Sequence, residues 1–245
     1  MIRFSGAIVL AALLAVAASF AQAQQAASPD REAIERIVRD YLLRNPEVLV
    51  EAMTELRRRQ EAAQEEATRT ALAENRAALY EDPASPTAGN VRGDVTIVEF
   101  FDYHCGYCKQ AYEPLMALLR EDSNVRFVFK ELPILSPESR IAAAGALAAG
   151  RQGKYMEMHE ALMTARGRLT RDRVLDIART LKLDAARLQA DMESADVQEA
   201  IDSNLRLAAM LGVDGTPAFF IGDQLVPGAL DLDQLKALVA EARRK

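Results

Sequence analysis

The sequence predicts an α/β fold that is preceded by a helical arm. Two runs of β-branched and aromatic residues have the length of strands, Val95 to Phe101 and Val125 to Lys130, and residues 107–120 between them have helical periodicity. This order indicates a strand–helix–strand unit with parallel strands. An Ala- and Leu-rich stretch, residues 137–211, predicts helices set inside the sheet framework. The expected domain, residues 94–245, is completed by strands at 218–221 and 224–226 and by a final helix at 232–244.

The amino end has the features of a cleaved secretory signal. Arg3 gives a short positive start, Gly6 to Phe20 is an almost uninterrupted apolar run, and Ala21-Gln22-Ala23 has the small-x-small form of a cleavage site. An uncleaved anchor is the alternative, but the apolar run is short for a membrane span. We therefore expect residues 1–23 to be removed on export.

Charge and cysteine content limit the classes of function that the chain is expected to have. Without Arg3, the expected mature chain of 222 residues carries 29 basic residues against 36 acidic ones, which argues against a nucleic-acid partner. Exported proteins of this size often contain structural disulfides, yet this chain has only two cysteines, and two residues separate them. The cysteines are therefore expected to have a role other than cross-linking distant segments.

A helical arm is predicted over residues 24–80. An apolar stripe at helical spacing runs through its first part, and Asn45-Pro46 interrupts the stripe, because proline suits the first turn of a new helix. The polar stretch that follows, residues 57–78, contains good helix formers but hardly any large apolar residue. The stripe consists of Ile34, Ile37, Val38, Tyr41 and Leu42, and then of Val48, Leu49, Ala52, Met53 and Leu56.

The apolar stripe of the arm has no obvious core to cover within the same chain. Self-association would bury it, so we expect the arm to mediate oligomerisation. The alternative is that residues 33–56 fold back onto the catalytic domain. Residues 81–93 are rich in proline and glycine and are expected to form a loop that links the arm to the domain.

The motif Cys105-Gly106-Tyr107-Cys108 follows a predicted strand and begins a predicted helix. At a helix start the unpaired N–H groups and the macrodipole favour a negative charge, so Cys105 is expected to have a lowered pKa and to be the attacking thiolate. Cys108, one turn further into the helix, is expected to be shielded and to attack the mixed disulfide that Cys105 forms, which releases the substrate. The pair therefore predicts thiol–disulfide exchange.

An acid in the preceding strand could serve the second thiol. Glu99 lies six residues before Cys105, within an apolar run. Desolvation there would raise the pKa of its carboxyl group, and it could exchange a proton with Cys108 directly or through water. The alternative is that Glu99 faces solvent on the polar side of its strand, since the alternation of residues in the strand does not settle which way it points.

Two other roles for the cysteine pair fit less well. A zinc site needs two further ligands, and the mature chain adds only His104 and His159, without the usual ligand spacing. A structural disulfide would close a very small loop with little entropic gain. His159 is expected to be a packing or surface residue, whereas His104 either stabilises the Cys105 thiolate as a cation or simply faces solvent. No metal or other cofactor is expected, and the methionines within residues 156–163 predict no copper site.

Two segments resemble the DsbA family of thiol–disulfide oxidoreductases. Residues 100–109, Phe-Phe-Asp-Tyr-His-Cys-Gly-Tyr-Cys-Lys, resemble the active site of that family, and residues 212–220, Gly-Val-Asp-Gly-Thr-Pro-Ala-Phe-Phe, resemble its cis-proline loop. The resemblance implies a thioredoxin fold with an inserted helical domain at about 137–211.

The same resemblance implies roles for further residues. Pro217 would be cis and lie against the cysteine pair, Thr216 would offer backbone groups to an extended substrate, and Glu99 would be the buried acid of the family. From the residues alone, Pro217 could equally be a trans proline at the start of an edge strand. Further substrate contacts would come from residues around the first cysteine, namely His104, Gly106 and Tyr107.

The arm resembles the amino-terminal extension of the ScsC-type branch of this family, over Tyr-Leu-Leu-Arg-Asn-Pro-Glu-Val-Leu at residues 41–49. The resemblance implies a periplasmic homo-oligomer, such as a trimer, that acts on exported proteins with cysteines and exchanges electrons with a membrane redox partner. A disulfide isomerase or reductase is therefore expected. A DsbA-like dithiol oxidase is the alternative enzyme, and a holdase or metal-handling binding module is the alternative of another class.

Overall fold

The computed structural model describes residues 31–244. The expected signal, residues 1–23, lies outside the described residues. Within residues 31–244, no helix is both long and apolar enough to cross a membrane. The chain divides into two units, Met1–Ala63 and Gln64–Lys245, and the boundary falls inside a long helix.

The described part of the first unit is helical. Helix α2 (Arg31–Arg44) ends at Asn45, whose side-chain amide donates to the Tyr41 carbonyl at 2.8 Å, and α3 (Glu47–Glu74) begins directly after Pro46. Proline has no N–H to donate and so costs nothing where a helix begins. The prediction that Asn45-Pro46 separates two helices is confirmed.

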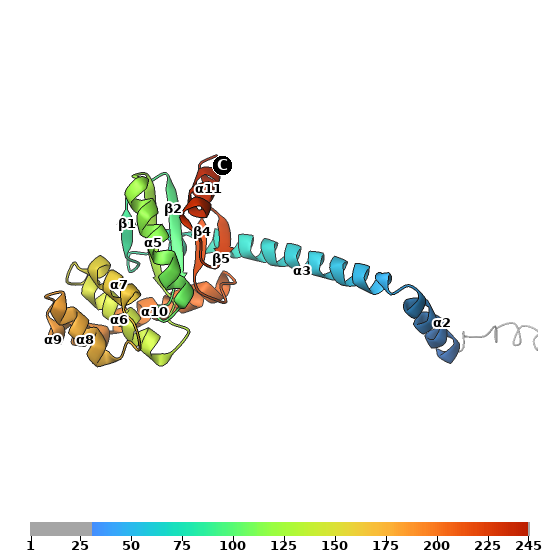
Figure 1. Cartoon of the computed structure of the whole chain (residues 1–245), viewed down its shortest axis with the longest axis horizontal. Coiled ribbons are helices and arrows are strands. Elements are labelled where there is room, and N and C mark those ends of the chain that lie inside the picture. Colours follow the sequence, from blue (N-terminus) through green and yellow to red (C-terminus); the bar gives the residue numbers. More distant parts are fainter. Residues whose placement is uncertain (1–30, 245) are drawn as a thin grey trace, which may run out of the picture. The chain divides into compact units, whose positions relative to one another are not determined.

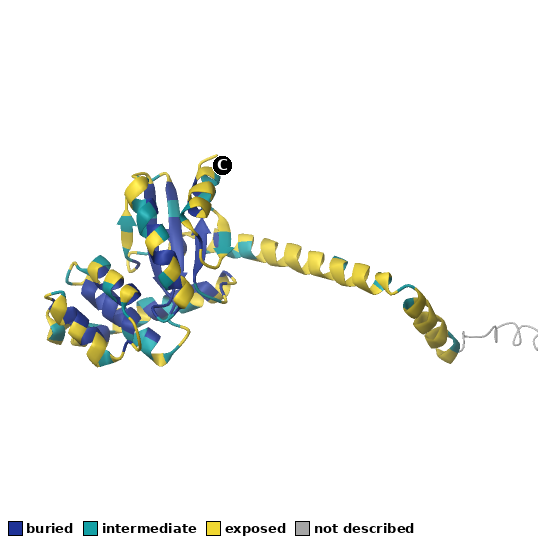
Figure 2. Ribbon diagram, in the orientation of Figure 1, coloured by how far each residue is buried: buried dark blue, intermediate teal, exposed yellow. Residues whose placement is uncertain are grey.

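The apolar stripe of this unit is exposed (Figure 2). No residue of α2 is buried, and Ile37 keeps 67% of its surface exposed. The exposed large side chains of residues 31–63 are Ile34, Ile37, Val38, Tyr41, Leu43, Leu49, Val50, Met53 and Leu56. The described residues of the first unit, taken by themselves, therefore give this stripe no core.

The second unit is built on a five-stranded sheet with the order β1-β3-β2-β4-β5 (Figure 1). Strands β2 (Val95–Phe101) and β3 (Val125–Glu131) are parallel, and α5 (Gly106–Glu121) connects them. On the other side of β2 lies β4 (Ala218–Ile221), antiparallel to it, and β5 (Gln224–Pro227) pairs antiparallel with β4. The predicted strand–helix–strand unit is confirmed.

The sheet separates two apolar cores. Successive residues of a strand point to opposite faces. Ile97 belongs to the face that packs against α5, α11 (Leu232–Ala242) and the inserted helices. Val98 belongs to the other face, which packs against the end of α3, against α4 (Arg76–Tyr80) and against the last turns of α10. Because both faces are covered, the strands read as continuous apolar runs rather than as alternating patterns.

Five helices fill the chain between β3 and β4, all within the described residues (Figure 1). They are α6 (Pro137–Gly150), α7 (Tyr155–Thr164), α8 (Arg171–Thr180), α9 (Ala185–Met192) and α10 (Ala195–Met210). Helix α6 has a run of buried residues from Ala142 to Ala149, all small except Leu147, and packs against its neighbours at close range. At Gly145 an added Cβ would come within 2.5 Å of a Val174 methyl carbon, so the approach of α8 requires glycine there.

Residues 81–93, expected to be a loop, contain a short edge strand. Strand β1 (Thr87–Gly89) pairs antiparallel with β3. It has only three residues and follows two prolines, so no strand-length apolar run marks it in the sequence. Lys130 of β3 holds the segment that precedes β1 in place. Its ammonium group donates to the Ala78 carbonyl at 2.7 Å and to the Asp82 carboxylate at 2.9 Å.

The carboxyl end of the predicted arm packs within the second unit. Residues 57–78 were expected to bury little, yet Leu72 is only 4% exposed, and it shares a cluster with Leu79 and Tyr80. The Tyr80 hydroxyl donates to the Gly222 carbonyl at 2.5 Å. Leu72 is the one large apolar residue of this stretch, which is why its composition hides the burial.

Candidate active site

The two cysteines lie where β2 gives way to α5. Cys105 is the N-cap of α5, with an extended backbone (φ −74°, ψ 117°), and Cys108 is in the first turn. The Cys108 N–H donates to Cys105 Sγ at 3.4 Å, and the Cys105 N–H donates to the Asp102 carbonyl at 3.0 Å. The helix therefore begins with N–H groups directed at one sulfur atom.

The two thiols have opposite surroundings. Hydrogen bonds from the Cys108 thiol and from the N–H groups of Cys108 and Tyr107 lower the pKa of Cys105 from 9.0 to about 5. Cys108 is completely buried, and burial, followed by its hydrogen bond to Cys105, raises the pKa of its thiol above 9.0. At neutral pH, Cys105 is therefore a thiolate and Cys108 a thiol.

The loop before β4 lies against Cys105. The Thr216–Pro217 peptide bond is cis, and the Thr216 carbonyl oxygen is 3.1 Å from Cys105 Sγ. The two motifs that carried the resemblance therefore meet at one sulfur. The loop also lines a small cavity of about 140 Å³ between Gly212 and Gly228. The Thr216 side chain also helps to lower the pKa of Cys105.

Glu99 is buried on the face of the sheet that holds Cys108. It is 2% exposed and lies opposite Phe129 and Phe219 in the neighbouring strands. Burial raises the pKa of its carboxyl group from 4.5 to about 8, and the charge of Cys105 adds to the shift. Among the described residues, its Oε1 has no hydrogen-bond partner. The solvent-facing alternative is therefore wrong, and one carboxyl oxygen is available to take up a proton.

The structure adds a second buried acid, Glu131, at the end of β3. Its Oε1 accepts hydrogen bonds from the hydroxyl groups of Tyr103 at 3.0 Å and Tyr155 at 2.9 Å, and the Tyr103 oxygen is 2.9 Å from His159 Nδ1. Burial raises the pKa of Glu131 well above 4.5 and lowers that of His159 to about 3, so His159 is uncharged at neutral pH. An acid inside an apolar strand, the signal that pointed to Glu99, was also present for Glu131.

His104 ties the cysteine turn to the inserted helices. Its Nδ1 is 3.2 Å from Ser139 Oγ in α6, and its Nε2 accepts the Leu169 N–H at 3.2 Å. Because the Nε2 lone pair is occupied by a donor, the ring fits the neutral form rather than a cation beside Cys105. Lys109 adds a second tie, since its ammonium group donates to three carbonyls near the end of α7, those of Leu162, Met163 and Ala165.

Gly106 and Tyr107 form the exposed side of the motif. Tyr107 is 66% exposed, and a Cβ added to Gly106 would meet no atom within 4 Å. The fold therefore does not require glycine at 106. Both residues directly follow Cys105 in the first turn of α5.

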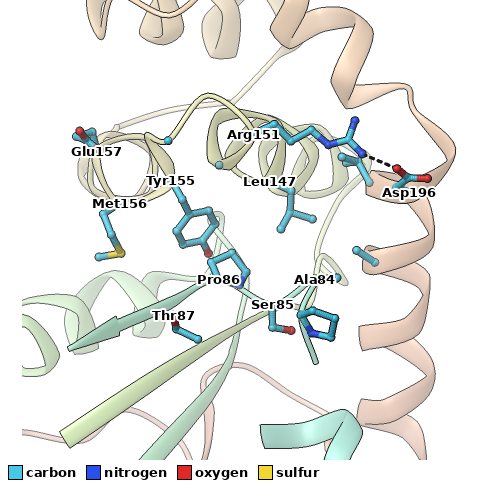
Figure 3. A pocket seen from close by; sticks show the side chains of 15 residues that line it. Ala84, Ser85, Pro86, Thr87, Leu147, Arg151, Tyr155, Met156, Glu157 and Asp196 are labelled. Atoms are coloured by element: carbon cyan, nitrogen blue, oxygen red, sulfur yellow. Dashed lines mark hydrogen bonds and ion pairs between the residues drawn. The ribbon is translucent and has the colours of Figure 1, made fainter. Parts of the chain in front are cut away.

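No group of three or more His, Cys, Asp or Glu side chains within residues 31–244 is placed to hold a metal ion. A cavity of about 580 Å³ is lined by residues 83–87 and by parts of α6, α7 and α10, but by neither cysteine (Figure 3). Its Arg151 pairs with Asp191 at 3.0 Å and with Asp196 at 2.9 Å. This arginine is thus already neutralised, and we assign the cavity no ligand.

Comparison with known proteins identifies the family. The family described as the DSBA-like thioredoxin domain matches residues 96–240. The chain belongs to this DSBA-like family. The family described as the copper resistance protein ScsC N-terminal domain matches residues 30–63.

Several solved structures resemble this DSBA-like protein. A thioredoxin-like oxidoreductase from Silicibacter pomeroyi is 47% identical, with a TM-score of 0.68, and the match covers 70% of this chain and 99% of that one. BcfH from Salmonella enterica Typhimurium is 30% identical, with a TM-score of 0.72, over 86% of this chain and 95% of that one. ScsC from Proteus mirabilis in a compact conformation is 32% identical, with a TM-score of 0.66, over 86% and 97%. The expected thioredoxin fold with inserted helices is confirmed.

Curated relatives match over a shorter part of their length. The Na(+)/H(+) antiporter NhaA 1 of Salinispora arenicola is 34% identical over 166 residues, which are 65% of this chain and 26% of the antiporter. Disulfide bond formation protein D of Bacillus subtilis is 22% identical over 166 residues, 63% of this chain and 75% of that protein. The chain thus spans about a quarter of the length of the antiporter that it matches.

We expect the Cys105 thiol of the reduced protein to titrate near pH 5, because the Cys108 thiol and the first N–H groups of α5 stabilise its anion. The measurement is the ultraviolet absorbance of the thiolate as a function of pH. Cys108→Ala removes the largest of these contributions and should raise the midpoint, whereas Cys105→Ser should abolish it. A wild-type midpoint near 9.0, the ordinary value, would contradict the assignment.

We expect Glu99→Gln to become more stable relative to the wild type as the pH rises from 4.5 to about 8. The folded wild type keeps a proton that its unfolded chain loses above 4.5, so the wild type loses stability across this range, by up to about 1.4 kcal/mol per pH unit. Glutamine does not titrate. Urea unfolding at several pH values measures the difference, and Glu113→Gln, at an exposed position of α5, is the control. A difference that stays constant with pH would show that Glu99 is ionised in the folded protein.

Proposed function

We propose that this protein is a periplasmic thiol–disulfide oxidoreductase that isomerises or reduces wrong disulfides in exported proteins. The proposal is carried by one observation: Cys105, whose thiol has a lowered pKa at the start of α5, is paired with the buried Cys108 thiol one turn later. A thiolate attacks foreign disulfides, and a shielded neighbour can close on it afterwards.

Cys105 is the nucleophile in this proposal. Its thiolate attacks one sulfur of a substrate disulfide, a disulfide forms between Cys105 and the substrate, and the other substrate sulfur leaves as a thiolate. In isomerisation, a different thiolate of the substrate attacks the substrate sulfur of this mixed disulfide. A new substrate disulfide forms and Cys105 leaves as a thiolate, with no net oxidation or reduction.

Cys108 and Glu99 release substrates that do not rearrange. The Glu99 carboxylate accepts the Cys108 proton, the Cys108 sulfur attacks Cys105 Sγ, and the substrate leaves as a thiolate. The substrate has then gained two electrons, and the protein holds a Cys105–Cys108 disulfide. A membrane redox partner has to reduce that disulfide before the next cycle. Because the pKa of Glu99 is about 8, only a small fraction is ionised at neutral pH, and resolution should speed up in mild alkali.

The cis-proline loop and the exposed side of the motif place the substrate. Thr216 has its backbone beside the Cys105 sulfur, where an extended substrate segment can pair with it, and Pro217 follows directly at the start of β4. Gly106 and Tyr107 leave the approach to the sulfur open. His104 contributes by holding the turn, since both of its ring nitrogens are engaged inside the protein.

Dithiol oxidation, as in a DsbA-like oxidase, is the second candidate. The lowered pKa of Cys105 favours it, because stabilising the thiolate stabilises the reduced protein and makes its disulfide a stronger oxidant. The exposed apolar stripe of the first unit favours the isomerase, since assembly through it would bring several thiolates to one substrate. A holdase or a metal-handling module would need neither the lowered pKa nor the buried partner thiol.

The amino-terminal region supports export and assembly. We propose that residues 1–23 direct export and that α2 with the first part of α3 joins copies of the chain, such as three, through the exposed stripe. The match of residues 30–63 to the ScsC N-terminal domain supports the arm as a distinct functional element. Burying this stripe between copies would remove a large apolar surface from water.

Ribonuclease refolding tests the direction of the reaction. We expect the reduced wild-type protein to reactivate scrambled ribonuclease, and Cys105→Ser to fall to the uncatalysed rate because it lacks the nucleophile. Cys108→Ser should keep part of the activity and accumulate mixed disulfides. Activity that survives in Cys105→Ser would rule out the assigned nucleophile. Efficient oxidation of reduced ribonuclease without isomerase activity would favour the oxidase.

Light scattering tests the arm. We expect the mature protein to have the mass of an oligomer, and a chain that starts at Gln64 to have the mass of a monomer while keeping the buried Leu72. The double variant Ile37→Glu, Val50→Glu should also be monomeric, because it places charges on the apolar stripe. Gln60→Glu adds a charge at an exposed polar position and serves as the control. A monomeric mature protein would end the proposal of assembly.

A further inference from the structure

The buried acid Glu131 binds two tyrosine side chains that come from different parts of the second unit. Tyr103 belongs to the turn between β2 and α5, and Tyr155 is the first residue of α7. The hydroxyl groups of both donate to the same oxygen of Glu131, Oε1, at 3.0 Å and 2.9 Å. Glu131 itself is the last residue of β3. One oxygen atom therefore joins a strand, the cysteine turn and the inserted helices.

His159 of α7 holds the Tyr103 hydroxyl group from the other side. The Tyr103 oxygen lies 2.9 Å from His159 Nδ1. A hydroxyl group has one proton, and Tyr103 donates it to Glu131, so Nδ1 has to carry a proton of its own and donate it to the Tyr103 oxygen. Because burial lowers the pKa of His159 to about 3, the ring is neutral and this is its single N–H proton. The Tyr103 hydroxyl group is thus both a donor and an acceptor within the protein.

Aromatic rings enclose this network. The rings of Phe101 and Phe129 lie 5.0 Å and 4.7 Å from the ring of His159, centroid to centroid. Tyr103, Glu131 and His159 are each only 1% exposed. In such surroundings a hydrogen bond is stronger than in water, and a hydroxyl group that loses its acceptor is costly. The network therefore favours one position of the Tyr103 side chain.

Tyr103 lies two residues before the reactive sulfur. The turn that carries it closes through the Cys105 N–H, which donates to the Asp102 carbonyl at 3.0 Å. The groups that lower the pKa of Cys105 come from two places, the first turn of α5 and Thr216 in the loop before β4. Hydrogen bonds weaken steeply as their geometry departs from the optimum. The turn therefore has to keep one position relative to both α5 and this loop.

We propose that Glu131 and Tyr103 are positioning residues for Cys105: the hydrogen bond between them fixes the cysteine turn to the end of β3 and so keeps the Cys105 sulfur within reach of its donors on both sides. The inference rests on the proposed function, because it concerns the thiolate that carries the reaction. Neither residue takes part in making or breaking a bond to sulfur. Both act through the position of the turn.

The role requires an acceptor oxygen at residue 131, not a charge. Among residues 31–244, the second oxygen of Glu131, Oε2, has no hydrogen-bond partner, so a proton on the carboxyl group can reside there. Oε1 then accepts both hydroxyl groups whether or not Glu131 is ionised. A glutamine side chain offers the same acceptor oxygen. Leucine has a similar size but no acceptor, so it separates the hydrogen bond from the filling of space.

Titration of the Cys105 thiol in the reduced mature protein tests the inference. The thiolate absorbs in the ultraviolet, and we expect a midpoint near pH 5 for the wild type and for Glu131→Gln, which keeps the acceptor. Glu131→Leu and Tyr103→Phe each break the hydrogen bond and should raise the midpoint by about one pH unit, the effect of one hydrogen bond to an anion. Tyr103→Phe keeps its ring in the aromatic cluster and decides the question where Glu131→Leu does not fold.

Tyr155→Phe is the matched control. It also removes one hydroxyl group that donates to Glu131 Oε1, but it leaves Tyr103 bound to that oxygen. Urea unfolding should show a similar loss of stability in Tyr155→Phe and Tyr103→Phe, whereas only Tyr103→Phe should raise the midpoint. The equilibrium with glutathione gives a second readout. Since a stable thiolate favours the reduced protein, a midpoint one unit higher should shift this equilibrium about tenfold toward the Cys105–Cys108 disulfide.

The outcomes separate the inference from the proposed function. A folded Tyr103→Phe with the wild-type midpoint and the wild-type glutathione equilibrium would overturn the inference. An equal rise of the midpoint in Tyr155→Phe would also overturn it, and so would a Glu131→Gln that behaves like Glu131→Leu. A wild type whose own midpoint lies near 9.0 would instead overturn the proposed function.

Discussion

The first turn of α5 stabilises the negative charge on Cys105. The surroundings of this sulfur therefore have to supply hydrogen-bond donors. A charged sulfur that is only slightly exposed needs donors, and the helix start, the Cys108 thiol and the turn closed by Asp102 provide or position them. The pKa of Cys108, only three residues further on, is raised instead, because this thiol lies wholly inside the core. The difference between the two thiols therefore comes from where the helix begins, not from the residues between them.

The two buried acids, Glu99 and Glu131, differ in their hydrogen-bond partners. Glu99 and Glu131 occupy neighbouring strands and the same face of the sheet, and in the described chain each has one buried oxygen without a hydrogen-bond partner, but the other oxygen of Glu131 accepts two tyrosine hydroxyl groups. An acid held by two donors is fixed in place and links the turn to α7. Within the described chain, no pair of hydroxyl groups holds Glu99 in this way, and this contrast supports the proposal that Glu99 exchanges a proton with Cys108.

Local patterns were enough to predict strands β2 to β5, the helix start at Cys105 and the break at Asn45-Pro46, because each depends on a few consecutive residues. The facing of Glu99 could not be predicted, since helices cover both faces of β2 and remove the alternation that would reveal it. Asp102 and Glu131 were missed for another reason. Their partners, Leu135 and Tyr155, are brought to them by folding, and the pattern around each acid says nothing about a distant N–H or hydroxyl group.

The chain passes the cysteine turn twice, once where it enters the helical insertion and once where it leaves it. The chain leaves β3 through the segment that holds Leu135 against Asp102, and it returns to β4 through the loop that places Thr216 at the Cys105 sulfur. His104 and Lys109 tie the turn to α6, α7 and the loop beyond α7 between these two points. A change inside the insertion can therefore reach the surroundings of Cys105 without altering the strands. Such an arrangement lets the first turn of α5 stay the same while the surface around Cys105 varies.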